Sequence, residues 1–233
     1  MKTDIAVIGA GTLINSYNIK KDHIRENLNK YTIKAYKLLP EIKNPHILDI
    51  GCGTGVPTIE LAQISGGDVT GVDNDPLSLE ILQNKINTLE LNNQVRFIED
   101  SINTLTFTEK SFDILWAEGS VFVMGFEDSI KEWYRFLKPQ GFLVIHDDDK
   151  EKNKKLELVK KYGYNLIAEL DLSNQIWVEE YFIPLEQLIK EFKEKYPDDL
   201  ELSAELNKDQ MEIDQARLNS QRASSFIVIL QKL

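Results

Sequence analysis

One short segment restricts the possible folds more than any other part of this chain. It reads Ile47-Leu-Asp-Ile-Gly-Cys-Gly-Thr-Gly55, an apolar run that ends in three closely spaced glycines. Glycine tolerates the backbone angles of sharp turns, and its missing Cβ lets a ligand approach the main chain. The helix expected over about 57–64 would then direct its first amides at a polar or anionic group. The segment therefore predicts the strand, loop and helix that open an α/β ligand-binding fold.

Short apolar strands alternate with helical patterns along most of the chain. We predict strands at 46–50, 68–73, 95–99, 112–117, 142–146, 166–172 and 226–230. We predict helices near 57–64, 77–89, 127–137 and 150–162, and a polar, helix-rich stretch at 185–221. This alternation is typical of an α/β protein with a doubly wound, mainly parallel sheet.

The second predicted strand ends in an acid at the spacing of a ribose-binding site. Asp73 follows Gly51 by 22 residues (73 − 51), close to the roughly 20 residues expected for a carboxylate that accepts hydrogen bonds from both ribose hydroxyls. The alternative is that Asp73 caps the helix after Pro76, a role that is open to Asp75 as well. The glycine motif before it favours ribose binding.

The glycine loop differs from a dinucleotide site, because Val56 stands three residues after Gly53, where that fingerprint requires glycine. The string from Asp49 to Gly55 instead resembles the first motif of class I methyltransferases that use S-adenosylmethionine (SAM). The resemblance covers about 31–147 and continues through Glu99-Asp-Ser101, Phe112-Asp-Ile-Leu-Trp116 and Leu137-Lys-Pro-Gln-Gly141. It implies a Rossmann-like, doubly wound, seven-stranded, mostly parallel sheet with an antiparallel last strand and a helical lid before that strand.

The same resemblance implies which residues hold the cofactor. Asp49 and the 51–55 backbone would hold the methionine part of SAM, and Asp73 its ribose. Asp100 would contact the adenine amino group, although a plain loop acid is the alternative there. The full set of expected cofactor residues is Asp49, Gly51, Cys52, Gly53, Thr54, Gly55, Asp73, Asn74, Asp100, Ser101, Ile102 and Glu118.

Methyl transfer from a sulfonium is an in-line displacement, so the enzyme needs alignment in a dry pocket, and a base only where the acceptor holds a proton of high pKa. Glu118, after the fourth strand, is our candidate for orienting the acceptor or the SAM amino group, against a solvated loop acid. His146, after the fifth strand, is a candidate base, against a structural histidine. The acids at 147–149 could bind magnesium together with Glu118, but we expect them to cap the next helix and expect no metal site.

The segment after the fourth strand lacks the Asn/Asp-Pro-Pro-Tyr/Phe pattern of enzymes that methylate amino groups on bases and glutamine. It resembles methyltransferases of largely unassigned substrate that stand near the ubiquinone and menaquinone C-methyltransferases. This implies a methyltransferase domain at 31–233 with a lid at 174–222, and we expect a cover segment at 1–30. The resemblance also implies that the acceptor pocket is lined by Trp177, Glu180, Tyr181 and Phe182 and covered on its other side by Tyr17, Tyr31 or Tyr36. Packing alone is the alternative for each aromatic ring.

A second glycine-containing stretch, Asp4-Ile-Ala-Val-Ile-Gly-Ala-Gly11, resembles the opening of a nucleotide site. Ile14 replaces the third glycine there, and no acid closes a second strand about 20 residues later. We therefore assign this stretch to the cover segment.

The formal net charge of −11 disfavours a nucleic-acid partner, because the phosphate backbone would repel the protein. The single cysteine, Cys52, cannot form an internal disulfide, and no run of 18 apolar residues indicates a membrane span. We expect a cytoplasmic monomer or homodimer that meets neither nucleic acid nor membrane.

The sequence therefore predicts a SAM-dependent methyltransferase that acts on a small-molecule acceptor and releases S-adenosylhomocysteine. The alternative is a SAM-binding protein of the same fold without methyl transfer. It would either transfer an aminopropyl group, for which the paired acids of a polyamine pocket are missing after the fourth strand, or bind a partner without catalysis.

Overall fold

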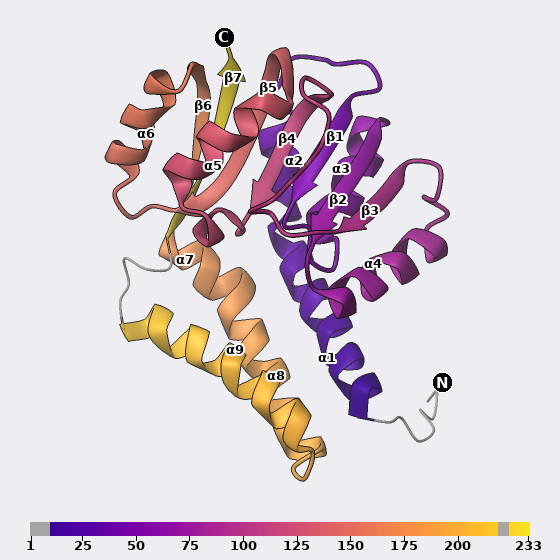
Figure 1. The fold of residues 1–233 in the computed structure, drawn as a ribbon. Coiled ribbons are helices and arrows are strands. Elements are labelled where there is room, and N and C mark those ends of the chain that lie inside the picture. The colour runs from indigo at the N-terminus through magenta and orange to yellow at the C-terminus, as the bar shows by residue number, and fades with distance from the viewer. Residues whose placement is uncertain (1–9, 219–223) are drawn as a thin grey trace. The chain divides into compact units, whose positions relative to one another are not determined.

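The computed structural model describes residues 10–218 and 224–233, which divide into two compact units (Figure 1). The sheet unit contains 29–172 and 224–233. The helical unit contains, among the described residues, 10–28 and 173–218. Of the glycine-containing stretch at 4–11, residues 4–9 lie outside the described residues, and Ala10 and Gly11 begin the first helix.

Within the described residues, the sheet unit has seven strands in the order β3-β2-β1-β4-β5-β7-β6. They are β1 (His46–Ile50), β2 (Asp68–Asp73), β3 (Val95–Glu99), β4 (Phe112–Glu118), β5 (Leu137–Asp148), β6 (Tyr164–Leu172) and β7 (Ser225–Lys232). Strands β1 to β5 pair in parallel, whereas β7 runs antiparallel to both β5 and β6. The expected mostly parallel sheet with an antiparallel last strand is therefore confirmed.

Helices cover both faces of this sheet: Figure 1 shows α5 and α6 on one face and α2 and α3 on the other. The helices of the sheet unit are α2 (Asn29–Tyr36), α3 (Val56–Ser65), α4 (Pro76–Thr88), α5 (Phe126–Trp133) and α6 (Lys152–Lys161), with 3₁₀ turns η2 (Val121–Val123) and η3 (Tyr134–Phe136). Helix α5 buries Phe126, Ile130 and Trp133, which recur at the spacing of one helical face. These side chains pack on alternate residues of the central strands and form the main core of the unit.

The helix expected over 127–137 is shorter than predicted. It ends at Trp133, and after a 3₁₀ turn Leu137 already pairs with Phe112 of β4. Strand β5 therefore begins five residues before the expected Phe142 (142 − 137), and Pro139 lies within it next to Gln140, whose φ is 63°. The apolar residues near 137 are compatible with the helical period of 3.6 residues and with the strand period of 2. The prediction of this boundary from the sequence pattern was therefore wrong.

The helical unit consists of α1 (Ala10–Arg25), η1 (Glu26–Leu28), α7 (Asn174–Trp177), the π-helical turn η4 (Val178–Phe182), α8 (Ile183–Lys195) and α9 (Leu200–Leu218). The polar stretch predicted to be helix-rich is helical over 185–195 and 200–218, with a turn between the two helices. Among the described helices of both units, none combines the length and apolar character needed to cross a membrane.

A buried hydrogen bond joins the first and last helices of this unit. The Tyr17 hydroxyl donates to Asp209 Oδ2 at 2.6 Å, and Lys21 Nζ donates to the other carboxylate oxygen at 2.7 Å. Burial raises the pKa of Tyr17, and the hydrogen bond to Asp209 and its negative charge raise it further. The phenol therefore stays protonated and acts as a permanent donor to a carboxylate that water barely reaches.

Replacing Tyr17 with phenylalanine should lower the free energy of unfolding by about 1.5–3 kcal/mol, because a buried carboxylate loses one of its donors. Urea denaturation followed by circular dichroism measures this loss. The matched control is Tyr196→Phe, a half-exposed ring at the end of α8, for which we expect a change within about 0.5 kcal/mol. Equal stability of the two variants would contradict the account of this bond.

Candidate functional site

Polar side chains of the sheet unit gather at the carboxyl ends of its parallel strands. Strands β1 and β2 end at Ile50 and Asp73, and β4 ends at Glu118. The antiparallel β7 starts at this same edge, because Ser225 pairs with Asp148 at the end of β5. Open α/β sheets bind their ligands at the carboxyl edge, so we take this edge as the candidate site.

The glycine loop turns sharply between β1 and α3. Its three glycines have positive φ angles of 77°, 50° and 82°, and the amides of Gly51 and Cys52 both donate to the carbonyl of Val72 at 2.8 and 2.9 Å. A Cβ on Gly51 would overlap the Cβ of Ser120, whose hydroxyl donates to the Ile50 carbonyl at 2.5 Å. The loop is therefore pressed against the segment after β4, and only glycine fits at position 51.

Gly55 precedes the first turn of α3 and offers no side chain to cap it. The first amides of a helix have no partner within the helix, so they need one from outside it. The end of α3 that meets the carboxyl edge of the sheet is thus suited to an anionic group.

Asp73 and Asp75 divide two roles between them. Asp75 caps α4, since its carboxylate accepts hydrogen bonds from the amides of Leu77 and Ser78 at 3.2 and 3.3 Å. Asp73 instead accepts from Gly53 N at 2.8 Å and from Asp75 N at 3.0 Å. Capping is therefore excluded as the role of Asp73. Each of its half-buried oxygens can accept a further hydrogen bond.

Asp100 lies directly beside Asp73, because its amide donates to the Asp73 carbonyl at 3.0 Å. Its own Oδ1 accepts from Ser101 N at 2.7 Å, and both side chains are half-buried. Ile102 is half-buried against the core, whereas Asn74 is exposed. The structure thus brings together the expected ribose and adenine residues at the ends of β2 and β3.

Two expected cofactor residues, Asp49 at the end of β1 and Cys52 in the glycine loop, are buried. Asp49 is 1% exposed and accepts a hydrogen bond from Thr58 Oγ1 of α3 at 2.6 Å. Burial raises the pKa of Cys52, and the negative charges of Asp49 and Asp73 raise it further. The Cys52 thiol therefore stays neutral and serves as packing rather than as a nucleophile.

A second polar group lies across β4, β5 and β7. The Glu118 side chain is 2% exposed, and its Oε1 accepts from Thr32 Oγ1 at 2.7 Å and from Trp116 Nε1 at 2.9 Å. Its Oε2 lies 3.6 Å from His146 Nδ1, and His146 Nε2 lies 2.8 Å from Ser225 Oγ. Glu118 is therefore not the solvated loop acid of the alternative reading.

Sequence reasoning missed Thr32 and Ser225. They lie 86 and 107 positions from Glu118 along the chain (118 − 32 and 225 − 118), in α2 and β7, and neither belongs to a local motif. Only the pairing order of the strands could have indicated Ser225, because it makes β7 the neighbour of β5.

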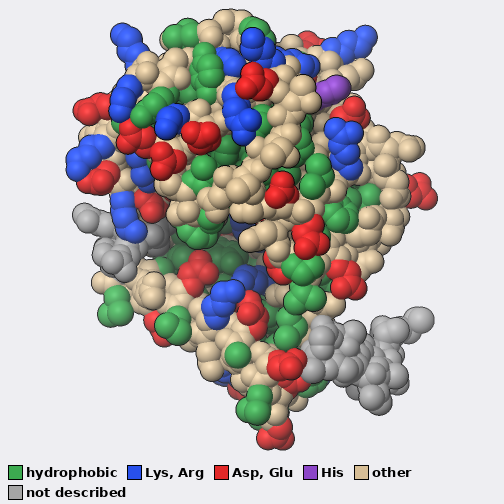
Figure 2. All heavy atoms as spheres, viewed as in Figure 1, with side chains coloured by type: hydrophobic (Ala, Val, Ile, Leu, Met, Phe, Trp, Pro, Cys, Tyr) green, Lys and Arg blue, Asp and Glu red, His purple; other side chains and the backbone are tan. Residues whose placement is uncertain are grey.

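The acids at 147–149 do not cap α6 as expected. Glu151 occupies the N-cap position, and among the described contacts its side chain makes no capping bond. Asp147 and Asp148 instead pair with Lys155 Nζ at 2.7 and 2.9 Å. Figure 2 shows acidic and basic side chains interspersed over the α5 and α6 face.

These ion pairs make stability depend on pH. Burial alone would raise the pKa of Asp148, but the hydrogen bond and charge of Lys155, with the charge of Lys150, lower it. A lowered pKa in the folded state stabilises the protein above the unfolded pKa of about 4, and this contribution is lost as the pH falls through the folded value.

Replacing Lys155 with methionine should therefore cost about 1 kcal/mol of unfolding free energy at pH 7, where this value already allows for the partial exposure of the pair, and less near pH 2. Urea denaturation at both pH values measures the difference. In the control Lys154→Met the lost pair with Glu151 is exposed and screened by solvent, and we expect no measurable change. A cost of Lys155→Met that does not fall with pH would refute the assignment.

The residues expected at the acceptor divide between the two units. Trp177, Tyr181 and Phe182 form one ring cluster of the helical unit, with centroids 5.5–6.1 Å apart. Tyr17 belongs to the same unit, as does Glu180, whose carbonyl accepts from Asn27 Nδ2 at 3.0 Å. Their contact with an acceptor stays a prediction.

The tyrosines of α2 lie in the sheet unit. Tyr31 is half-buried, with Lys30 Nζ 5.3 Å from its ring centroid, in the turn of α2 that also carries Thr32. Tyr36 lies beside Ser65, at the end of α3 opposite the glycine loop, in a groove of about 440 Å³. The expectation that Tyr36 covers the acceptor is therefore wrong.

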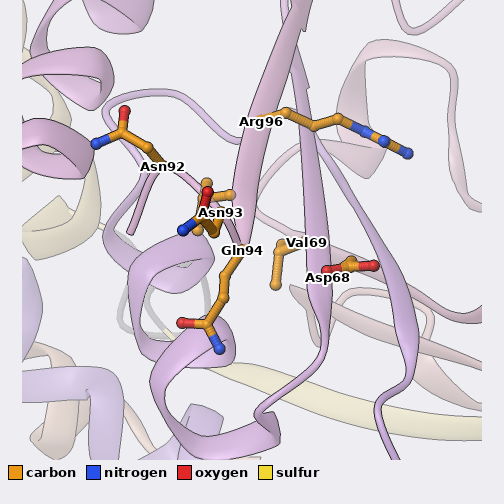
Figure 3. Close-up of a pocket in the computed structure, with 7 residues that line it drawn as sticks. Asp68, Val69, Asn92, Asn93, Gln94 and Arg96 are labelled. Carbon is orange, nitrogen blue, oxygen red and sulfur yellow. The ribbon is translucent and has the colours of Figure 1, made fainter. Parts of the chain in front are cut away.

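A hollow of about 210 Å³ lies at the amino ends of β2 and β3 (Figure 3). Its lining comprises Asp68, Val69, Asn92, Asn93, Gln94, Val95 and Arg96. Figure 3 shows Arg96 and Asn92 pointing in opposite directions, and Arg96 Nε donates to Thr70 Oγ1 at 2.9 Å. Because this hollow is at the opposite edge of the sheet, it is separate from the candidate site.

Comparison with known proteins finds similarity to methyltransferases. Residues 47–141 match the family model described as a methyltransferase domain, a range that holds the glycine loop, Asp73, Asp100 and Glu118. The chain is 35% identical over 143 residues to the demethylmenaquinone methyltransferase of Chlorobaculum tepidum, which covers 59% of this chain and 55% of that protein. It is 30% identical over 102 residues to a sterol 24-C-methyltransferase of Gibberella zeae, with 43% and 27% covered.

A solved structure has the same fold. A SAM-dependent methyltransferase from Geobacter sulfurreducens, in complex with S-adenosylhomocysteine, aligns with a TM-score of 0.69 at 18% identity and covers 89% of this chain and 91% of that one. The curated relatives are matched over about half of their length or less.

Proposed function

We propose that this chain, whose residues 47–141 match the family model of a methyltransferase domain, is a class I SAM-dependent methyltransferase that binds SAM and transfers its methyl group to a small-molecule acceptor. The observation that carries this proposal is the turn at Gly51–Gly55, with the Asp73 carboxylate held against its Gly53 amide at the carboxyl edge of the sheet. The names of two relatives, a demethylmenaquinone methyltransferase and a sterol 24-C-methyltransferase, support a small molecule as acceptor.

The residues at this edge suit each part of SAM. The first amides of α3 and the loop backbone are suited to the carboxylate of the methionine part, with the buried Asp49 below them. The remaining lone pairs of Asp73 are suited to two ribose hydroxyls, and those of Asp100 to an amino group. Ser101 and Ile102 follow Asp100 in the chain, which supports a contact of both residues with the same ring system.

When bound, SAM supplies a methyl group on a positively charged sulfur. The chain's own part is to hold an acceptor in line with that group and to exclude water. Glu118 ends β4, and Ser120 follows it and contacts the glycine loop through the Ile50 carbonyl. This position supports a role for both residues between the SAM and the acceptor.

Incubation with methyl-labelled SAM and a panel of acceptors tests the proposal. The panel comprises a naphthoquinol, a phenol, a 1,3-diketone, a primary amine and a tertiary amine. We expect label transfer to at least one member, with formation of S-adenosylhomocysteine and inhibition by added S-adenosylhomocysteine. Stoichiometric SAM binding without transfer, on this and wider panels, would favour the alternative of a SAM-binding protein without methyl transfer. Location in the cytoplasm and a monomeric or homodimeric state remain predictions from the sequence.

A further inference from the structure

Glu118, His146 and Ser225 form a line of buried polar contacts. All three side chains belong to the sheet unit, and each is exposed by 7% or less. The carboxylate, the imidazole and the hydroxyl follow one another across adjacent strands β4, β5 and β7 at the carboxyl edge. A buried histidine between an acid and a hydroxyl is an arrangement that can accept a proton and stabilise the resulting charge.

We propose that Ser225, His146 and Glu118 form a relay that takes a proton from the acceptor, and that the acceptor is therefore a small molecule that loses a proton when it is methylated, such as a hydroxyl compound or a carbon acid. This inference rests on the proposed function. It deepens that function by naming the substrate class.

The geometry sets the direction of the relay. Glu118 Oε1 already accepts from Thr32 and Trp116, which holds the carboxylate in place with Oε2 turned toward His146 Nδ1 at 3.6 Å. A carboxylate at this distance favours the proton on Nδ1. Nε2 then holds a lone pair, so the Ser225 hydroxyl, 2.8 Å away, is the donor in their hydrogen bond.

The order of the strands places this relay beside the cofactor residues. The loop after β1 contacts the segment after β4 through Gly51 and Ser120, and β4, β5 and β7 continue from there in sequence across the sheet. An acceptor over β5 and β7 would thus have the methyl donor on one side and the Ser225 hydroxyl on the other.

In the proposed step the acceptor X–H gives its proton to Ser225 Oγ while the Ser225 proton moves to His146 Nε2. Glu118 stabilises the imidazolium that forms. The electron pair left on X forms the X–C bond to the methyl group, and the pair of the broken S–C bond stays on sulfur. The proton on His146 passes to water after the product leaves, so atoms and charges balance.

Thr32 and Trp116 are positioning residues in this scheme, because they act on the proton only through Glu118. In this scheme Thr32 and Trp116 hold Glu118 Oε1, which leaves Oε2 to interact with His146.

The first test reads the protonation state of His146 and needs no acceptor. The chain has three histidines, and the other two, His23 and His46, are 69% and 55% exposed, so a His146→Gln sample identifies the buried ring in long-range ¹H–¹⁵N spectra. We expect the neutral ring to carry its proton on Nδ1, and Glu118→Gln to remove this preference. A proton on Nε2 in the wild type would overturn the proposal, because Ser225 could not then pass its own proton on.

The second test is kinetic and uses the acceptor panel. We expect transfer to the naphthoquinol, the phenol or the diketone and none to the tertiary amine. Ser225→Ala should lower kcat about 100-fold, with an unchanged KM for SAM, and Ser225→Thr should restore most of it. The limb of the pH profile that reports a proton acceptor should vanish in His146→Gln. The control is Ser111→Ala, a hydroxyl beside the amino end of β4 that bonds to the Thr108 carbonyl.

Unchanged kcat in Ser225→Ala, or transfer to the tertiary amine alone, would overturn the relay while leaving the methyltransferase function intact. Failure of the wild type to bind SAM would instead overturn the function, and the ¹⁵N spectra would still decide whether the relay has the stated protonation.

Discussion

Replacing Asp73 with alanine should weaken SAM binding at least 100-fold. Each hydrogen bond to a charged acceptor contributes about 1.5–3 kcal/mol, and two ribose hydroxyls would lose theirs together. A tenfold change corresponds to about 1.4 kcal/mol, so even the lower bound exceeds two powers of ten. The variant also frees the Gly53 amide from its 2.8 Å bond, which loosens the loop and weakens binding further. Calorimetric titration with SAM measures the effect.

Two further variants make this result specific. Asp68→Ala removes an exposed acid from the other end of the same strand and should bind SAM as the wild type does. Asp73→Asn retains one acceptor oxygen and should fall between wild type and alanine. Equal affinity of Asp73→Ala and Asp68→Ala would show that the ribose is held elsewhere.

Replacing Gly51 with alanine should reduce the free energy of unfolding by about 3 kcal/mol or more. A φ of 77° costs an L residue about 1–2 kcal/mol, and the new Cβ would overlap the Ser120 Cβ, which cannot move away without shifting the main chain after β4. Because this overlap joins the glycine loop to the end of β4, SAM binding should fall as well. Thermal and urea denaturation measure the stability.

Gly53→Ala is the matched control in the same loop. Its φ is also positive, at 50°, but a Cβ there meets no described atom within 4 Å. We expect a cost of about 1 kcal/mol from strain alone, with a marked loss of SAM affinity because the methyl group would enter space reserved for the ligand. If Gly51→Ala and Gly53→Ala lose the same free energy of unfolding, the overlap with Ser120 is not the reason that position 51 requires glycine.

The sequence predicted the parts of this protein that are determined locally. Strands β1 to β3 and the glycine loop carry apolar runs, turn residues and spacing within a few positions of one another, so their bounds agree closely with the structure. The sequence left open whether Asp73 or Asp75 caps α4. The structure shows that Asp75 is the cap, because its carboxylate accepts from the amides of the first turn and that of Asp73 does not.

Other features depend on residues that meet only in the fold. Thr32 and Ser225 reach Glu118 and His146 from distant elements, and no pattern within the chain indicates such contacts. The acids after His146 stand where a cap is expected, yet Lys155, one turn into α6, attracts them more strongly than the helix terminus does. A direct ion pair to a charged amine outweighs a partial charge at a helix end.

The aromatic residues show a different limit. The resemblance to methyltransferases implies that Tyr17, Tyr181 and Phe182 lie at the acceptor, but large aromatic rings serve packing and binding equally well. In the helical unit Tyr17 packs edge-on against Phe192 with centroids 5.3 Å apart, so packing explains its ring without an acceptor. Composition alone therefore does not separate the two roles.

Calorimetric titration of the wild-type protein with SAM, S-adenosylhomocysteine and NAD tests the central claim most directly. The account predicts one site per chain for SAM and for S-adenosylhomocysteine, and no binding of NAD, because Val56 stands where a dinucleotide loop needs its third glycine. Absence of SAM binding by folded protein, or binding of NAD in its place, would contradict it.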